Sequence, residues 1–217
     1  MVIDHIGLFF FPQYEIFRII GRIAFPLFAW FIANGARYTH NIKTYALRLF
    51  VFALISQIPF TLANLQIGNP LWYQNVIFTL FFGLLSIIII KNTKNKFFWI
   101  LGALVCAALA GVLNSDYGAA GVFSIIAFYL FFDNMTYMFF AQSIILFVLP
   151  LFVFLTENSL HMGLSSFYPA SQIEGFGLLS LFFISLYNKK RGLPTKYLFY
   201  YFYPIQYIVI FILKLIM

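Results

Sequence analysis

The chain has 217 residues, of which 63% are hydrophobic and 22% aromatic, and its mean hydropathy is +0.94. Soluble domains are only about half apolar, so this composition excludes an ordinary soluble protein and predicts an integral membrane protein. The formal net charge of +7 does not indicate a nucleic-acid surface, because the 13 lysines and arginines are concentrated between apolar stretches. The single cysteine, Cys106, excludes a disulfide framework and a thiol pair for metal or redox chemistry.

Apolar segments recur along the whole length and predict an all-α fold, one polytopic transmembrane bundle over residues 1–217 without a soluble domain. We expect about nine segments, of which the first is short. In chain order they are Met1–Phe11, Ile16–Ala36, Tyr45–Leu65, Trp72–Ile90, Phe97–Leu113, Ala119–Phe132, Tyr137–Leu155, Gln172–Tyr187 and Tyr197–Ile216.

Basic residues cluster in alternate connections between these segments. They gather at 37–48, 91–96 and 189–196, whereas no lysine or arginine occurs at 12–15, 66–71, 114–118 or 157–171. By the positive-inside rule the basic connections are cytoplasmic. The pattern therefore predicts a multi-pass protein whose N-terminus lies inside and whose C-terminus lies outside.

The first segment is too short to span a bilayer by itself. Its 11 residues rise about 16 Å as a helix, against a hydrocarbon core of about 30 Å. We therefore expect about ten apolar residues to precede Met1 in the natural protein, in preference to a re-entrant start. A signal peptide is not indicated, because the segment has no basic region and no small-residue cleavage site.

Charged and titratable residues interrupt the first two segments at Asp4, His5, Arg18 and Arg22. In hydrocarbon such groups are costly unless they are paired or face a water-filled cavity, so they indicate a functional site. Counting ~1.5 Å per residue from Pro12 places Asp4 and His5 level with Arg22. Arg18 and Arg22 share one helix face, which suggests a site for a phosphate, a carboxylate or a developing oxyanion. The alternative is a structural ion pair between Asp4 and Arg22.

Further polar residues reach a comparable depth and together predict a lined cavity. They are Ser56, Gln57, Asn75 and Thr79, with Asp116 and Tyr117 in the turn that could close its outer mouth. Taken singly, an amide or hydroxyl is more typical of an interhelical hydrogen bond than of a ligand contact. Asp116 taken singly is more typical of a solvated turn. Arg48 either snorkels to the cytoplasmic interface or binds a donor.

A histidine with a carboxylate is the minimum apparatus for general base catalysis. Consecutive helical residues diverge by about 100°, so Asp4 is free to orient Arg22 while His5 faces a substrate. The sequence contains no phosphate loop, nucleophile elbow or metal-ligand spacing. These features favour acyl transfer from a cytosolic donor. One alternative is an ion-coupled transporter in which Asp4, His5 and Arg22 form a proton relay or anion site, and another is a non-catalytic assembly factor.

Several runs of residues resemble the TraX family, named for an F-pilin N-terminal acetylase. They are 3–7, 18–29, 48–49, 53–60, 75–80, 116–118, 196–200 and 203–204. The resemblance implies a transmembrane acyltransferase of the bacterial inner membrane that uses acetyl-CoA as donor, with neither a metal nor a nucleic-acid partner. Its acceptor would be a pilin N-terminus, a glycan or a lipid headgroup.

The same resemblance implies roles for individual residues. His5 would be the base or acyl-handling residue, Arg18 and Arg22 the paired arginines, and Asp4 the acid beside the histidine. Members of the family usually have a longer first segment. They also lead us to expect a histidine shortly after Tyr-Pro, where this chain has Gln206.

Overall fold

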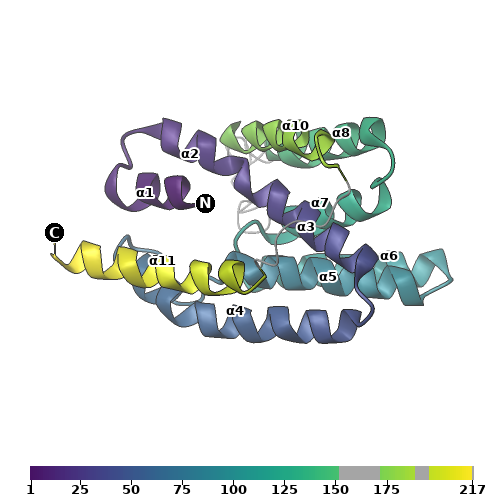
Figure 1. The fold of residues 1–217 in the computed structure, drawn as a ribbon, viewed down its shortest axis with the longest axis horizontal. Coiled ribbons are helices and arrows are strands. Elements are labelled where there is room, and N and C mark those ends of the chain that lie inside the picture. The colour runs from purple at the N-terminus through teal and green to yellow at the C-terminus, as the bar shows by residue number, and fades with distance from the viewer. Residues whose placement is uncertain (152–171, 189–195, 217) are drawn as a thin grey trace, which may run out of the picture.

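In a computed structural model of the chain, residues 1–151, 172–188 and 196–216 are described. These parts are helical and contain no β-strand, which confirms the predicted all-α fold. The elements, labelled in Figure 1 where there is room, are α1 (Val2–Phe10), α2 (Glu15–Arg22), α3 (Ala24–Tyr38), α4 (Ile42–Leu65), α5 (Val76–Asn92), α6 (Lys96–Val112), α7 (Gly118–Leu130), α8 (Met135–Ser143), η1 (Ile144–Val148), η3 (Gln172–Leu179), α10 (Ser180–Ser185) and α11 (Lys196–Ile216).

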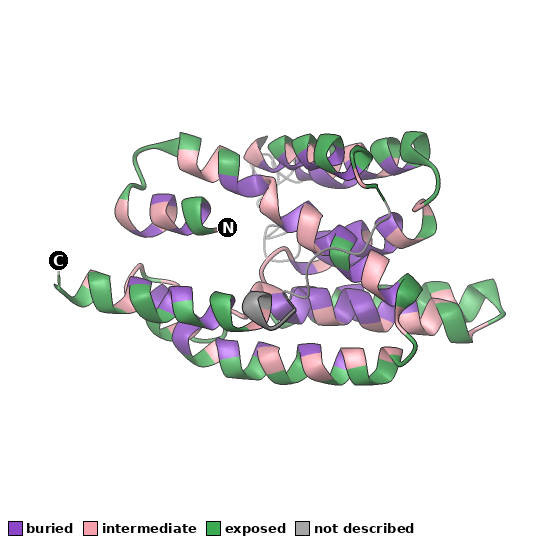
Figure 2. Ribbon diagram, in the orientation of Figure 1, coloured by how far each residue is buried: buried purple, intermediate pink, exposed green. Residues whose placement is uncertain are grey.

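The helices form two outer layers with a pair of helices between them. Figure 1 shows α4, α5, α6 and α11 on one side, α2, α8 and α10 on the other, and α3 with α7 between. Small side chains in α3 allow this close packing, since Ala29, Ala33 and Ala36 are completely buried. Figure 2 shows the buried positions facing the middle of the bundle and the exposed positions on its outside.

The outside of the bundle is apolar. Large hydrophobic side chains are well exposed on helices of both layers, for example Ile58 (68%), Val112 (69%) and Phe182 (64%). Apolar surface of this extent marks contact with a membrane or a partner protein. Two stretches, Glu15–Tyr38 and Ile42–Leu65, are also helices of sufficient length and hydropathy to cross a bilayer. The full set of nine spanning segments stays a prediction.

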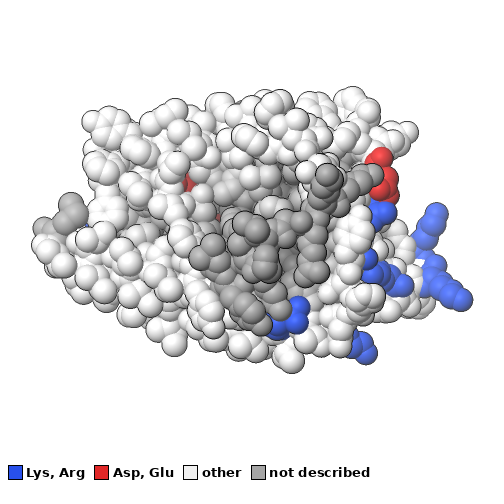
Figure 3. Space-filling view, in the orientation of Figure 1, with Lys and Arg blue, Asp and Glu red and all other residues white. Residues whose placement is uncertain are grey.

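Positive charge is concentrated at one end of the bundle. Figures 1 and 3 together show lysine and arginine side chains at the end where α3 finishes and where α4 and α6 begin. The exposed residues of these connections include Arg37, Lys43 and Lys94. The basic cluster at 189–196 falls mostly outside the described residues. The basic connections at this end of the bundle are those that the positive-inside rule assigns to the cytoplasmic side.

Glycines allow α1 to pack directly against α2. A Cβ atom at Gly21 would overlap the Asp4 side chain, and one at Gly7 would overlap Phe17. The absence of these side chains brings the backbone of α2 close to the residues of α1. The approach of Gly21 thereby places Asp4 within reach of the arginines on α2.

Replacing Gly21 by alanine is expected to destabilise the protein by about 1–3 kcal/mol, the usual cost of overpacking. This cost exceeds the gain of up to about 1 kcal/mol that alanine brings to a helix interior. Gly35→Ala is the matched control, because its Cβ would meet only the end of the Tyr45 side chain, at 3.2 Å. Thermal unfolding in detergent compares the two variants. A Gly21→Ala protein as stable as Gly35→Ala would contradict the packing argument.

Candidate functional site

The centre of the site is Arg22, which lies at the end of α2 and is buried between two carboxylates. Its Nη2 donates a hydrogen bond to Asp4 Oδ1 (2.9 Å) and its Nη1 donates one to Glu174 Oε1 (2.8 Å). Arg18, one turn earlier on α2, approaches the same Asp4 oxygen at 3.2 Å. The side chains of Arg22 and Glu174 are only 7% and 6% exposed. Two arginines are thus balanced by two carboxylates inside the protein.

The sequence argument for an anion site at Arg18 and Arg22 does not include Glu174, which supplies one of the two carboxylates. An acidic residue in an apolar segment is itself a signal of function, and this signal could have identified Glu174. Arg22 Nε is buried without a hydrogen-bond partner among the described residues. A preorganised donor of this kind suits a developing oxyanion.

Pro26 explains why Arg22 stands at a helix end. Proline has no N–H, so the carbonyl of Arg22, four residues earlier, loses its helical partner. The helical hydrogen bonding is accordingly interrupted at Ile23, between α2 and α3, although the backbone there keeps helical angles and the stretch Glu15–Tyr38 stays continuous. Gly177 lets η3 approach this break closely, since a Cβ there would lie 3.3 Å from the Arg22 carbonyl oxygen. The same element, η3, supplies Glu174.

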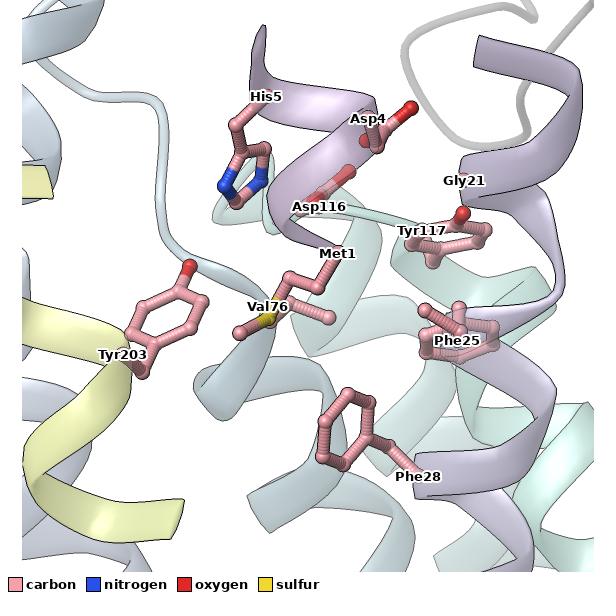
Figure 4. Close-up of a pocket in the computed structure, with 11 residues that line it drawn as sticks. Met1, Asp4, His5, Gly21, Phe25, Phe28, Val76, Asp116, Tyr117 and Tyr203 are labelled. Carbon is pink, nitrogen blue, oxygen red and sulfur yellow. The ribbon is translucent and has the colours of Figure 1, made fainter. Parts of the chain in front are cut away.

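His5 faces α11, on the other side of α1 from the arginines. Its Nδ1 lies 2.6 Å from Gln206 Nε2, and its Nε2 lies 2.9 Å from the Tyr207 hydroxyl. Figure 4 shows the His5 and Asp4 side chains pointing apart, as expected for consecutive residues of a helix. Asp4 therefore orients Arg22 and Arg18, and α11 holds His5. Sequence reasoning missed Tyr207 and noted Gln206 only as a departure from the family.

A small cavity of about 40 Å³ lies between these groups (Figure 4). Asp4 and His5 line it from α1, and Asp116, Tyr117 and Tyr203 line it from other parts of the chain. The cavity is therefore bordered both by α1 and by the turn between α6 and α7. Asp116 and Tyr117 of this turn are among the residues that the sequence argument places at a cavity.

Tyr117 is held in an unusual backbone conformation, with φ +65°. Left-handed backbone is costly for a bulky residue and persists only where the surroundings impose it. Here the Tyr117 ring stacks on Phe25, with centroids 3.8 Å apart, and the Arg22 guanidinium lies 5.5 Å from the same ring. Tyr117 therefore helps to fix the orientation of Arg22.

Asp116 is partly buried, and its turn is held by hydrogen bonds from Tyr73 and Thr79. The Tyr73 hydroxyl donates a hydrogen bond to its carboxylate (3.1 Å), and Thr79 donates to its backbone carbonyl. Burial raises the pKa of the Asp116 carboxyl, while the nearby Arg22 charge and the Tyr73 hydrogen bond act in the opposite direction. The turn is thereby fixed at the cavity.

The other polar residues of the predicted lining are not among those that border this cavity. Gln57 and Asn75 bond to each other, with Asn75 Nδ2 donating to Gln57 Oε1 over 2.8 Å, and they tie α4 to the start of α5. Thr79 Oγ1 lies 3.0 Å from Ser115 Oγ and donates to the Asp116 carbonyl, so it holds the Asp116 turn. Ser56 Oγ is buried without a hydrogen-bond partner in the described parts of the chain. Gln57, Asn75 and Thr79 therefore act between helices.

A larger apolar cleft of about 780 Å³ adjoins the small cavity. The two share Met1, Ala24, Phe28, Val76 and Tyr203. The cleft follows one face of α3 from Ala24 to Gly35, a helical rise of about 16 Å. It continues to Thr39, Tyr45 and Arg48, whose Nε is buried without a hydrogen-bond partner among the described residues. Arg48 thus borders the cleft.

No group of three or more His, Cys, Asp or Glu side chains that could hold a metal ion occurs within residues 1–151, 172–188 and 196–216. The chemistry that this geometry supports is proton transfer at His5 and stabilisation of negative charge at Arg22.

Comparisons with known proteins agree with the resemblance seen in the sequence. An uncharacterized protein of Rickettsia prowazekii is 34% identical over 99 residues, which cover 46% of this chain and 36% of that protein. A probable fimbrial assembly protein FimC (serogroup H1) of Dichelobacter nodosus is 27% identical over 225 residues, covering 95% of this chain and 87% of that protein. Protein TraX of Escherichia coli is 32% identical over 124 residues, covering 56% of this chain and 48% of that protein.

The matched stretches thus cover about a third of the Rickettsia protein and about half of the Escherichia coli protein. No solved structure matches the chain significantly. The family described as TraX protein matches residues 1–214, nearly the whole length. The chain therefore belongs to the TraX family.

Proposed function

We propose that the protein is a multi-pass enzyme of the bacterial inner membrane that transfers an acetyl group from cytosolic acetyl-CoA to an amine or hydroxyl on the far side. One observation carries the proposal. The buried His5 lines a small cavity that adjoins a long apolar cleft, and the far end of this cleft carries Arg48. The buried Arg22 contacts two residues of the same small cavity, Asp4 and Tyr117. The relatives include a probable fimbrial assembly protein and the Escherichia coli protein TraX, and their presence supports a pilin as acceptor.

The cleft has the shape and polarity that the coenzyme needs. Its walls along α3 are apolar and suit an extended, weakly polar arm, while Tyr45, Arg48 and Thr39 form a polar end. Among the described residues the buried Arg48 Nε has no hydrogen-bond acceptor, as expected at an anion-binding position. That end lies toward the exposed Lys43 and Arg37, so phosphate groups would bind on the basic side of the bundle.

The residues of the site supply the proton and charge handling of the reaction. As the acceptor nitrogen or oxygen forms a bond to the thioester carbonyl carbon, its proton passes to His5. Negative charge then develops on the carbonyl oxygen, which Arg22 Nε stabilises. When the carbon–sulfur bond breaks, the thiolate takes the proton back from His5. Asp4 and Glu174 keep the Arg22 guanidinium in one orientation throughout.

The test is transfer of radiolabelled acetyl from acetyl-CoA in reconstituted proteoliposomes. Acceptors are offered by class: a peptide with a free N-terminal amine, an amino sugar and phosphatidylethanolamine. We expect label to appear in one of them and to depend on the protein. The proposal fails if label stays on the coenzyme with every acceptor while the protein remains folded. It fails equally if the protein carries an intact labelled anion across the bilayer, as a transporter would.

Replacing Arg48 by glutamine is expected to raise the KM for acetyl-CoA about tenfold while kcat changes little, because one charge-assisted contact of about 1.5 kcal/mol is lost. Lys43→Gln removes an exposed charge from the same end of the bundle without touching the cleft, and is the matched control. Calorimetric binding of coenzyme A measures the same effect without turnover. Equal affinities of the two variants would exclude Arg48 from the donor site.

A further inference from the structure

Both nitrogens of the His5 ring are engaged by α11. Gln206 lies 2.6 Å from Nδ1 and Tyr207 lies 2.9 Å from Nε2. All three side chains are buried, with His5 at 7%, Gln206 at 8% and Tyr207 at 2% exposure. Two separate contacts, made by residues about 200 positions away in the chain, thus determine which ring nitrogen carries the proton.

The Gln206 amide has two orientations, related by a half-turn that exchanges Oε1 and Nε2. With Nε2 against the ring, the amide donates to Nδ1, so the ring proton sits on Nε2 and the Tyr207 hydroxyl accepts it. The amide oxygen is then buried without a partner among the described residues, while the Tyr207 hydroxyl donates its proton toward the neighbouring Tyr203 hydroxyl. This arrangement leaves the amide oxygen unpaired beside the site.

With Oε1 against the ring, the amide oxygen accepts the Nδ1–H of His5 and the Tyr207 hydroxyl donates to Nε2. The amide N–H groups are then without a partner among the described residues, so each orientation leaves part of the amide unpaired. The separation of 2.6 Å decides between the two orientations, because it is too short for an N–H···N contact and suits an oxygen acceptor better.

We propose that Gln206 is the positioning residue of His5: it accepts the Nδ1–H and thereby keeps Nε2 as the basic nitrogen. The inference rests on the proposed acyl transfer, in which a base must present a free lone pair to the acceptor. Gln206 takes the place that a carboxylate occupies in a catalytic triad, since Asp4 is committed to the arginines.

The Tyr207 hydroxyl then marks the place where the acceptor binds. It occupies the Nε2 lone pair at 2.9 Å, the distance at which an amine or hydroxyl donates its proton to a base. An acceptor displaces this hydroxyl from Nε2, and the Nδ1 contact to Gln206 keeps the ring in place. The two α11 residues therefore have different roles, one holding the tautomer and one occupying the site of the acceptor.

The test is the ¹⁵N spectrum of histidine-labelled protein in lipid, recorded without donor or acceptor under conditions where the rings are neutral. The His5 signals are assigned by their loss in His5→Asn. We expect a protonated Nδ1 and a bare Nε2 in the wild type. Gln206→Leu should shift the ratio toward protonated Nε2, Gln206→Glu should keep Nδ1 protonated, and Tyr207→Phe should leave Nδ1 protonated.

Transfer kinetics supply the second readout. General base catalysis is worth about 10²- to 10⁴-fold, so Gln206→Leu should lower kcat at least about tenfold with little change in the KM for the donor. Gln206→Glu should restore most of the rate. A wild-type spectrum with protonated Nε2, or an unchanged ratio in Gln206→Leu, would overturn the inference. An expected spectrum without any acetyl transfer would instead contradict the proposed function alone.

Discussion

Replacing Arg22 by methionine is expected to lower the free energy of unfolding by about 3–5 kcal/mol, the usual cost of removing one partner from a buried ion pair. Methionine fills a similar volume but donates no hydrogen bond. Asp4 and Glu174 would then lose the cation that they share, and their side chains are only 13% and 6% exposed, so water cannot replace it. Thermal or denaturant unfolding in detergent measures the loss.

The matched control is Arg37→Met. Arg37 also forms an ion pair, with Asp133 at 2.7 Å, but these side chains are 35% and 69% exposed. Such a pair contributes at most about 1 kcal/mol. A second check is the triple variant Arg22→Met with Asp4→Asn and Glu174→Gln, which should recover part of the stability because no buried carboxylate is left unpaired. An Arg22→Met protein as stable as Arg37→Met would contradict the buried network.

Replacing His5 by asparagine is expected to lower kcat for acetyl transfer by about 10²- to 10⁴-fold, the contribution of a general base. Asparagine is smaller than histidine and still offers polar atoms to Gln206 and Tyr207, so the fold should persist. The KM for acetyl-CoA should change little, because Arg48 and the apolar cleft are untouched. Steady-state transfer assays in proteoliposomes measure both constants.

His40→Asn is the matched control, since His40 is exposed beyond the end of α3 and does not border the cavity or the cleft. It should retain wild-type activity. If His5→Asn transferred acetyl as fast as His40→Asn, His5 would not be the base. The circular dichroism spectrum and elution volume of both variants show whether any loss of rate comes from misfolding.

Much of the site could be anticipated from residues close together in the chain. Asp4, His5, Arg18 and Arg22 stand out because charge is expensive in apolar segments, and this cost can be read from sequence alone. Only four residues, 11–14, connect α1 to α2, so the two helices must lie side by side. Counting helical rise then brings Asp4 level with Arg22, and the structure joins them at 2.9 Å.

The partners that complete the site come from distant parts of the chain. Glu174 lies 152 positions after Arg22, and Gln206 lies 201 positions after His5. Hydrophobic periodicity shows which face of a helix is apolar but not which other helix it meets. Gln57 and Asn75 show the same limit, because an amide that bonds another helix and an amide that lines a cavity look alike in a sequence.

The sequence by itself determined that this is an all-helical, strongly apolar protein and that its N-terminal segments carry charged residues in apolar surroundings. These properties follow from composition and from local spacing, and both can be read from each segment of the chain separately. Only the tertiary structure decided that Arg22 is neutralised by two carboxylates and that His5 is held by α11. Those contacts depend on how η3 and α11 pack against the first two helices, and packing is a property of the whole chain.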